Sequence, residues 1–158
     1  MASDRGPVRA LLRIGAIACL IGLAGCDETY PPELKGPISG VGYDCKTAGE
    51  SEPRPEDYVS AVDLDGDAGK DFIIDYGKTC AAERALYCRD EGCSVDVYVS
   101  AAAYAKVGGF TALAWHVESG ETGAKLVLEQ PGASCEKPAG QSCVDKRVWR
   151  DGALVSSP

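Results

Sequence analysis

The 158-residue sequence has little of several residue types on which catalysis and transition-metal binding depend. It contains a single histidine, His116, and no Cys-x-x-Cys pair, so a zinc site built from cysteine and histidine is not expected. Gly-x-Ser-x-Gly, His-Glu-x-x-His and P-loop patterns are also absent. His116 falls on the polar side of an alternating strand pattern, where a lone histidine is more often a bystander than a catalyst. We therefore predict that the protein is not an enzyme.

The apolar run near the N-terminus is too short to cross a bilayer. It covers residues 14–24, whereas a membrane-spanning helix needs about 20 apolar residues. Arg5, Arg9 and Arg13 precede the run, and a positive segment followed by a short apolar one is the layout of a secretory signal. We expect residues 1–25 to be a cleaved signal peptide.

The end of this segment, Leu23-Ala24-Gly25-Cys26, resembles the bacterial lipobox. The resemblance implies that Cys26 becomes the first mature residue and carries lipid, palmitate among its acyl chains. The alternative is an ordinary signal peptide that happens to contain a cysteine. Because several acyl chains hold a protein firmly on a membrane, we expect an envelope protein that is anchored and faces the periplasm. Asp27 resembles an inner-membrane retention signal of enteric bacteria, and the choice between inner and outer membrane stays open.

Positive charge is scarce in the expected mature chain. Residues 1–25 contain three arginines and one aspartate, so 13 basic and 23 acidic residues remain, a formal charge of −10. Such a surface repels nucleic acid and anionic lipid headgroups. We exclude nucleic acid as a partner and expect the N-terminal lipid to supply membrane attachment. A cation or a basic protein remains as a partner.

Six cysteines remain after cleavage, an even number that predicts three disulfides in an exported chain. Residues 79–88 are rich in helix formers with Thr79 as N-cap, and in a helix Cys80 and Cys88 would lie about 12 Å apart, too far for a disulfide. Cys88 and Cys93 flank a short turn, which leaves Cys45 for Cys80, and these two pairings are right or wrong together. The third predicted pair, Cys135 with Cys143, flanks a Lys-Pro-Ala-Gly loop.

The remaining patterns predict a tether followed by one mainly β domain. Residues 26–42 contain Pro31, Pro32 and Pro37 and show no apolar periodicity, which is typical of a flexible linker. Residues 43–158 are enough for one domain with a modest core. Strand patterns occupy residues 58–62, 72–76, 94–100, 111–118 and 125–129 and both sides of Asp151-Gly152.

Within these strands, alternation places Val95, Val97 and Val99 on one face of the first long strand and Leu113, Trp115 and Val117 on one face of the next. We expect a small α+β domain, mainly β, in which disulfides staple an antiparallel sheet that carries one short helix.

Four aspartates lie within nine residues between two strand patterns. Asp63, Asp65, Asp67 and Asp71 take places 1, 3, 5 and 9 of a loop, and the carbonyl of Gly69 takes place 7. Calcium loops supply oxygen ligands at such alternate places. An EF-hand also needs a glutamate at place 12, where this chain has Ile74, and helices on both sides, so this loop is not an EF-hand.

The spacing DxDGDxxxD resembles the calcium loops of integrin-type (FG-GAP) β-propeller repeats, although those loops favour glycine at place 6, where this chain has Ala68. A single loop excludes a propeller. The resemblance implies a structural Ca²⁺ ion held by Asp63, Asp65, Asp67, Gly69 and Asp71. The alternative is a solvated acidic turn.

Residues 62–155 also resemble uncharacterised small envelope lipoproteins of Gram-negative bacteria in the aspartate loop, the cysteine order and a closing Trp-x-Asp-Gly. The predicted function is therefore a lipid-anchored binding or structural role. One alternative is a periplasmic inhibitor of a cationic hydrolase such as lysozyme, because Ser39-Gly-Val-Gly-Tyr43 resembles the SGxxY motif of a lysozyme-inhibitor family. A further alternative is a hydrolase with an unrecognised site, for which Asp96 and Glu118 are candidate carboxylates.

Overall fold

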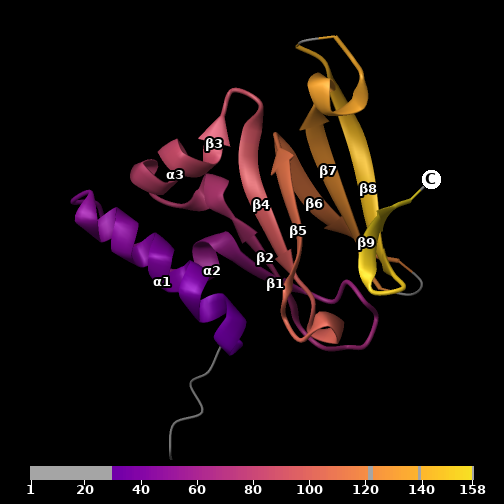
Figure 1. Ribbon diagram of the computed structural model, residues 1–158, viewed down its shortest axis with the longest axis horizontal. Helices are drawn as coiled ribbons and strands as arrows, with labels where there is room; N and C mark the ends of the chain where they lie inside the picture. The colour runs from indigo at the N-terminus through magenta and orange to yellow at the C-terminus, as the bar shows by residue number, and fades with distance from the viewer. Residues whose placement is uncertain (1–29, 121–122, 139, 158) are drawn as a thin grey trace, which may run out of the picture.

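The computed structural model describes residues 30–120, 123–138 and 140–157 (Figure 1). The predicted signal peptide and Cys26 lie outside the described residues. The helices are α1 (Pro32–Thr47), α2 (Pro55–Tyr58) and α3 (Ala81–Tyr87), with 3-10 turns η1 (Tyr76–Lys78), η2 (Ser100–Ala102) and η3 (Gly132–Cys135). The strands are β1 (Val59–Val62), β2 (Asp71–Asp75), β3 (Cys88–Arg89), β4 (Gly92–Tyr98), β5 (Lys106–Ala112), β6 (Ala114–Glu118), β7 (Lys125–Pro131), β8 (Ser142–Arg150) and β9 (Ala153–Ser156).

The strands form two antiparallel sheets. Sheet A has the order β1-β2-β4-β3, with β5 on the other side of β4, and sheet B has the order β6-β7-β8-β9. Every pairing among the described strands is antiparallel. The predicted class, a disulfide-stapled α+β domain that is mainly β, is confirmed, although the described residues contain three helices where one was expected.

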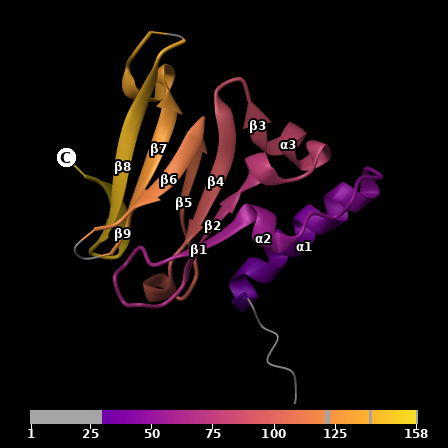
Figure 2. The same cartoon turned by 180° about the vertical axis from the view of Figure 1, so that it is seen from behind.

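Sheet A lies in the middle and is covered on both faces, as both ribbon views show (Figures 1 and 2). Phe72 and Ile74 of β2 pack in a cluster with residues of α1, whereas Ile73 points the other way into a cluster with β4 and sheet B. All five residues of β2 are buried for this reason. Val95, Val97 and Val99 share the face toward sheet B, as their alternation predicts.

Helix α1 corrects the prediction of a flexible tether for residues 32–42. Leu34, Val41 and Cys45 are buried, and Ile38 is partly buried in the same cluster. These four residues follow one another at steps of four, three and four, which is the apolar stripe of a helix. The stripe is narrow and is interrupted by glycine and proline, but Pro32 occupies the first turn, where its missing N–H costs nothing. The folded part of the chain therefore begins well before residue 43.

The predicted single strand over residues 111–118 is two strands. The break falls at Leu113, where the chain leaves sheet A as β5 and enters sheet B as β6. Ala112 is buried, whereas Leu113 is 47% exposed, so the prediction that Leu113 shares a core face with Trp115 and Val117 is wrong. Trp115 and Val117 do pack on the core, because alternation resumes only after the bend.

The disulfides join the three regions that the sequence predicts. Cys45–Cys80 links α1 to the start of α3, Cys88–Cys93 closes the β3–β4 hairpin, and Cys135–Cys143 links η3 to β8.

The N-cap of α3 differs from the prediction. Thr79 donates its hydroxyl to the carbonyl of Tyr76 and does not cap the helix. The carboxylate of Glu50 accepts hydrogen bonds from the N–H groups of Ala81 and Ala82, both at 2.9 Å. Glu50, about thirty positions earlier in the chain, thus caps the helix in place of Thr79, because its carboxylate accepts from two N–H groups of the first turn.

Candidate metal centre

The aspartate loop connects the end of β1 to the start of β2, where Val62 pairs with Asp71. Leu64 is the apolar anchor of the loop: it is buried and packs in the cluster between the two sheets. The backbone N–H of Ala124 donates to the carbonyl of Asp63, which ties the loop to the segment before β7. The loop is therefore held at both ends and in its middle.

Three of the four aspartates converge. Asp63, Asp65 and Asp71 each offer one carboxylate oxygen, and these three oxygens lie within 4.8 Å of one another. Oxygen ligands of one Ca²⁺ ion lie 2.3–2.6 Å from it, so two of them are at most about 5 Å apart. The oxygens of this triad already meet that limit, and hard carboxylate oxygens suit calcium. The triad therefore fits the ion that the loop spacing predicts.

Asp71 is the buried member of the triad, with no exposed surface. One of its oxygens accepts from the N–H groups of Leu64 (2.7 Å) and Asp65 (3.3 Å). The other oxygen accepts from the N–H of Ser100 in η2 (2.7 Å). A buried carboxylate needs such partners, because an unpaired charge costs several kcal/mol in a protein interior. Asp71 thus fixes the loop to the start of β2 and to η2.

Asp65 points to the same turn. It accepts from the hydroxyl of Ser100 (3.0 Å), the N–H of Ala101 (3.2 Å) and the N–H of Asp67 (3.1 Å). Burial raises the pKa of the Asp65 carboxyl, but these hydrogen bonds outweigh burial and lower its pKa below the ordinary value. Asp65 is therefore held in the ionised form that binds a cation.

Asp63 closes the loop on itself. Its two oxygens accept from the N–H groups of Gly66 (2.7 Å) and Ala68 (3.1 Å). An ionised carboxylate has about four lone-pair sites, so two hydrogen bonds leave capacity for a metal ion. The loop therefore positions this carboxylate without saturating it.

Asp67 is not one of the three aspartates whose oxygens converge within 4.8 Å, but, like two of them, it contacts Ser100. The carboxylate of Asp67 accepts from the N–H of Gly69 and from the hydroxyl of Ser100 (3.3 Å). Ser100 is the residue that sequence reasoning missed: it contacts Asp65, Asp67 and Asp71, yet it lies about thirty residues farther along the chain. No local sequence pattern predicts the role of Ser100, because the pairing of β2 with β4 brings this residue to the loop.

Ala68 occupies place 6 of the loop in the left-handed region, with φ of 65°. Calcium loops carry glycine at this place because the chain turns sharply there. Ala68 thus takes a conformation that glycine adopts readily, and the alanine side chain adds local strain.

The other candidate carboxylates lie on different sheets. Asp96 lies on sheet A and is buried against the ammonium of Lys106 (2.7 Å). Glu118 lies on sheet B, where Lys146 (2.9 Å) and His116 (3.5 Å) are its partners. Hydrogen bonding to Lys146 lowers the pKa of Glu118. Each carboxylate thus belongs to a separate ion pair.

The motif Ser39–Tyr43 lies on α1, with Tyr43 exposed and the Ser39 hydroxyl bonded to the carbonyl of Gly36.

Comparison of the chain with protein-family models, with curated proteins and with solved structures found no significant match. Among the described residues, no helix combines the length and the apolar character needed to cross a membrane.

Proposed function

We propose that this protein is a lipid-anchored component of the bacterial cell envelope with a binding or structural role, and that its aspartate loop holds a structural calcium ion. The observation that carries the calcium site is the convergence of Asp63, Asp65 and Asp71 in a loop fixed by backbone hydrogen bonds. The lipid anchor follows from the sequence around Cys26, and three disulfides suit a domain exported to an oxidising compartment.

The ion would tie together parts of the chain that meet at the loop. Asp63 follows β1, Asp71 begins β2, and Asp65 contacts η2. A cation shared by the three carboxylates offsets their mutual repulsion, which is about 3 kcal/mol for two charges 5 Å apart at an effective dielectric constant of 20. Asp67 and the carbonyl of Gly69 remain proposed ligands on loop spacing alone, with water completing the shell. Magnesium substitutes poorly, since it requires a tighter octahedral shell.

The acid excess of the chain favours a cationic partner. Residues 30–105 contain 15 acidic and 7 basic side chains, whereas residues 106–158 contain six of each. The net negative charge of the described chain therefore lies in the half that contains α1, α3 and the aspartate loop. A basic protein of the envelope is the partner class that this distribution supports.

Thermal unfolding of the full chain in chelator and in calcium tests the metal site. A dissociation constant of about 10⁻⁴ M is ordinary for extracytoplasmic sites, and calcium at one hundred times that value adds about 2.7 kcal/mol. We expect the melting temperature to rise with calcium, and we expect Asp65→Ala to remove most of the rise. Asp90→Ala, which deletes a carboxylate in the distant β3–β4 turn, should retain it. Equal melting curves of the unmodified chain in chelator and in calcium would leave the loop a solvated acidic turn.

A further inference from the structure

The disulfide between Cys88 and Cys93 differs from the other two described disulfides in how little of the fold depends on it. The two cysteines are five positions apart, compared with eight for Cys135–Cys143 and 35 for Cys45–Cys80. They also face each other directly across the β3–β4 hairpin, where Arg89 pairs with Gly92. A short loop that is already closed by strand pairing gains little from a covalent bond.

The neighbouring helix has its own attachments. The disulfide Cys45–Cys80 and the carboxylate of Glu50 hold the start of α3. At its end, Tyr87 stacks on Tyr76 with ring centroids 4.1 Å apart. Opening the hairpin disulfide therefore leaves α3 anchored at both ends and the fold intact.

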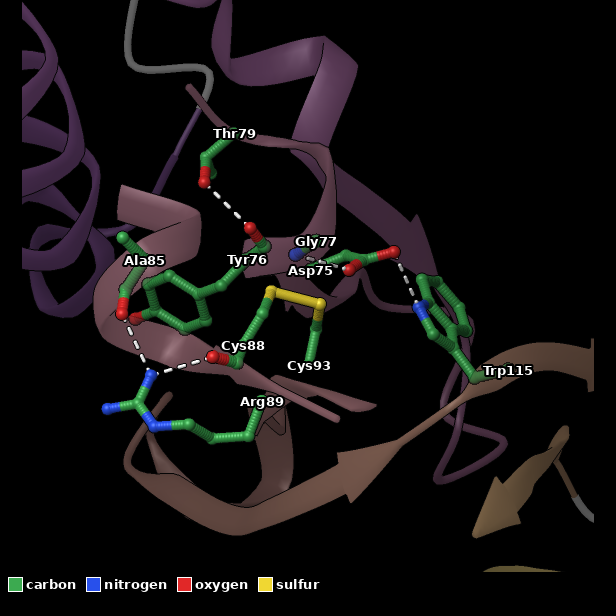
Figure 3. The surroundings of a disulfide bond; sticks show 9 residues. All are labelled: Asp75, Tyr76, Gly77, Thr79, Ala85, Cys88, Arg89, Cys93 and Trp115. Atoms are coloured by element: carbon green, nitrogen blue, oxygen red, sulfur yellow. Dashed lines mark hydrogen bonds between the residues drawn. A yellow bond between two sulfur atoms is a disulfide. The ribbon is translucent and has the colours of Figure 1, made fainter. Parts of the chain in front are cut away.

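One sulfur of this pair borders a cavity. The cavity has a volume of about 330 Å³ and lies where the chain passes from sheet A to sheet B. Cys93 is among the residues that line it, together with Asp75, Lys78, Leu113 and Trp115, and Cys88 is not. Figure 3 shows Cys93 on the side of the disulfide that faces Asp75 and Trp115. A molecule in the cavity is therefore in contact with Cys93 and not with Cys88.

Gly77 keeps this sulfur uncovered. A Cβ atom at position 77 would lie 3.1 Å from the sulfur of Cys93 and 3.0 Å from a carboxylate oxygen of Asp75. Both contacts are closer than ordinary van der Waals distances, so any other residue at position 77 would crowd the sulfur. Glycine at this position therefore covers the Cys93 sulfur less than any other residue would.

The charged groups that line the cavity are the Asp75 carboxylate and the Lys78 ammonium. The Asp75 carboxylate accepts from the N–H of Gly77 (2.9 Å) and from the indole N–H of Trp115 (2.8 Å), and it pairs with Lys78 (3.4 Å). The Lys78 ammonium lies 5.1 Å from the centre of the Trp115 ring, and about half of its side chain is exposed. It is the only cationic side chain among the described residues that line this cavity, and it offsets the charge of Asp75.

We propose that Cys88–Cys93 is a thiol–disulfide exchange site that accepts two electrons from a dithiol. A thiolate of the dithiol attacks the Cys93 sulfur from the cavity, the bond to Cys88 breaks, and the electron pair leaves on the Cys88 sulfur, which takes a proton from water. The second thiol of the dithiol loses its proton to water and attacks its partner sulfur in the mixed disulfide. Cys93 leaves as a thiolate and is protonated, so the dithiol becomes a disulfide and the chain becomes a dithiol. This proposal is independent of the calcium site.

Graded reduction of the full oxidised chain, kept in calcium, tests selectivity. Dithiothreitol is added, thiols are trapped by alkylation, and peptides are mapped. We expect Cys88 and Cys93 to be alkylated about tenfold faster than the other four cysteines of the domain, with the near-ultraviolet circular dichroism unchanged. Reduction of Cys135–Cys143 or Cys45–Cys80 at the same rate, or loss of the native spectrum with the first bond, would overturn the proposal.

Two monothiols test the route of attack. Mercaptoethanesulfonate is anionic and mercaptoethanol is neutral, so Lys78→Ala should slow the first by about threefold or more and the second far less. Lys125→Ala, which removes an equal charge on sheet B, should change neither rate. The trapped mixed disulfide should carry the reagent on Cys93. Reagent on Cys88, or equal slowing of both thiols by Lys78→Ala, would show that attack does not occur from the cavity.

Discussion

Glu83 is a buried carboxyl group at the contact between α3 and α1, and only 2% of its surface is exposed. Burial and a hydrogen bond with Asp44 raise its pKa from 4.5 to about 7. Between pH 4.5 and about 7, the Glu83 carboxyl is therefore protonated in the folded chain and ionised in the unfolded chain. The stabilisation is fully present below pH 4.5, declines as the pH rises toward 7 and is absent above it.

This gives the first prediction. The free energy of unfolding should fall by up to about 3 kcal/mol between pH 4.5 and 8 through this group, since one pKa unit is worth about 1.4 kcal/mol. Because glutamine cannot ionise, the unfolding free energy of Glu83→Gln should lose this pH dependence. The variant should also be more stable than the unmodified chain at pH 8. Urea unfolding at both pH values measures the effect, and Glu33→Gln on the exposed side of α1 is the control. A Glu83→Gln slope equal to that of the unmodified chain would contradict the prediction.

Ala68 supplies the second residue-scale prediction. Its φ of 65° lies in the left-handed region, which costs a non-glycine residue about 1 kcal/mol or more. Ala68→Gly should therefore raise the free energy of unfolding by about 0.5–1 kcal/mol, measured in urea. Ala85→Gly is a matched control within helix α3, where the same change should lower stability by about 1 kcal/mol. Loss of stability in both variants would show that the turn at place 6 differs from the structure.

At the scale of elements, helix α1 covers one face of sheet A. It closes the face of sheet A that carries Phe72 and Ile74. Leu34→Ala should cost about 2–4 kcal/mol of unfolding free energy, because it leaves a cavity at a fully buried position. Gly40→Ala on the same helix should instead stabilise by about 0.5–1 kcal/mol, since a Cβ there meets no atom within 4 Å.

Chemical denaturation compares these two variants with the unmodified chain. A cost below 1 kcal/mol for Leu34→Ala would mean that residues 32–42 are a tether after all.

The elements that sequence patterns predict are those defined by short-range chemistry. The turn at Asp151-Gly152 forms as expected, with both residues at positive φ, and the alternating valines of β4 face the core. The missed features depend on residues distant in sequence. Glu50 caps α3, and Ser100 reaches the aspartate loop, only because the fold brings them there. Spacing therefore predicted which aspartates form the loop, but not that Ser100 contacts three of them.

At the scale of the whole molecule, the three layers account for how a chain of this size buries a core on both faces of one sheet. Sheet A is sandwiched between the helices and sheet B, and chain continuity links the layers: α2 is followed directly by β1, and β5 is followed by β6 after the break at Leu113. The chain passes from sheet A to sheet B at Leu113, which lines the same cavity as Cys93. The aspartate loop and this cavity lie at opposite ends of β2, since Asp71 begins the strand and Asp75 ends it. A calcium site and a thiol-exchange site can therefore act without sharing a residue.

The proposed attachment of the whole molecule to a membrane depends on Cys26, and this proposal gives the last prediction. Cys26→Ser removes the sulfur that lipid would modify, so labelled palmitate should no longer be incorporated, the precursor should stay uncleaved at this site, and the protein should leave the membrane fraction. Cys19→Ser is the matched control, because Cys19 lies in the segment expected to be removed, and it should leave labelling and partition unchanged. The folded domain carries its own disulfides from Cys45 onward, so its melting temperature should be the same in both variants. Labelling that persists in Cys26→Ser would place the anchor elsewhere in the chain.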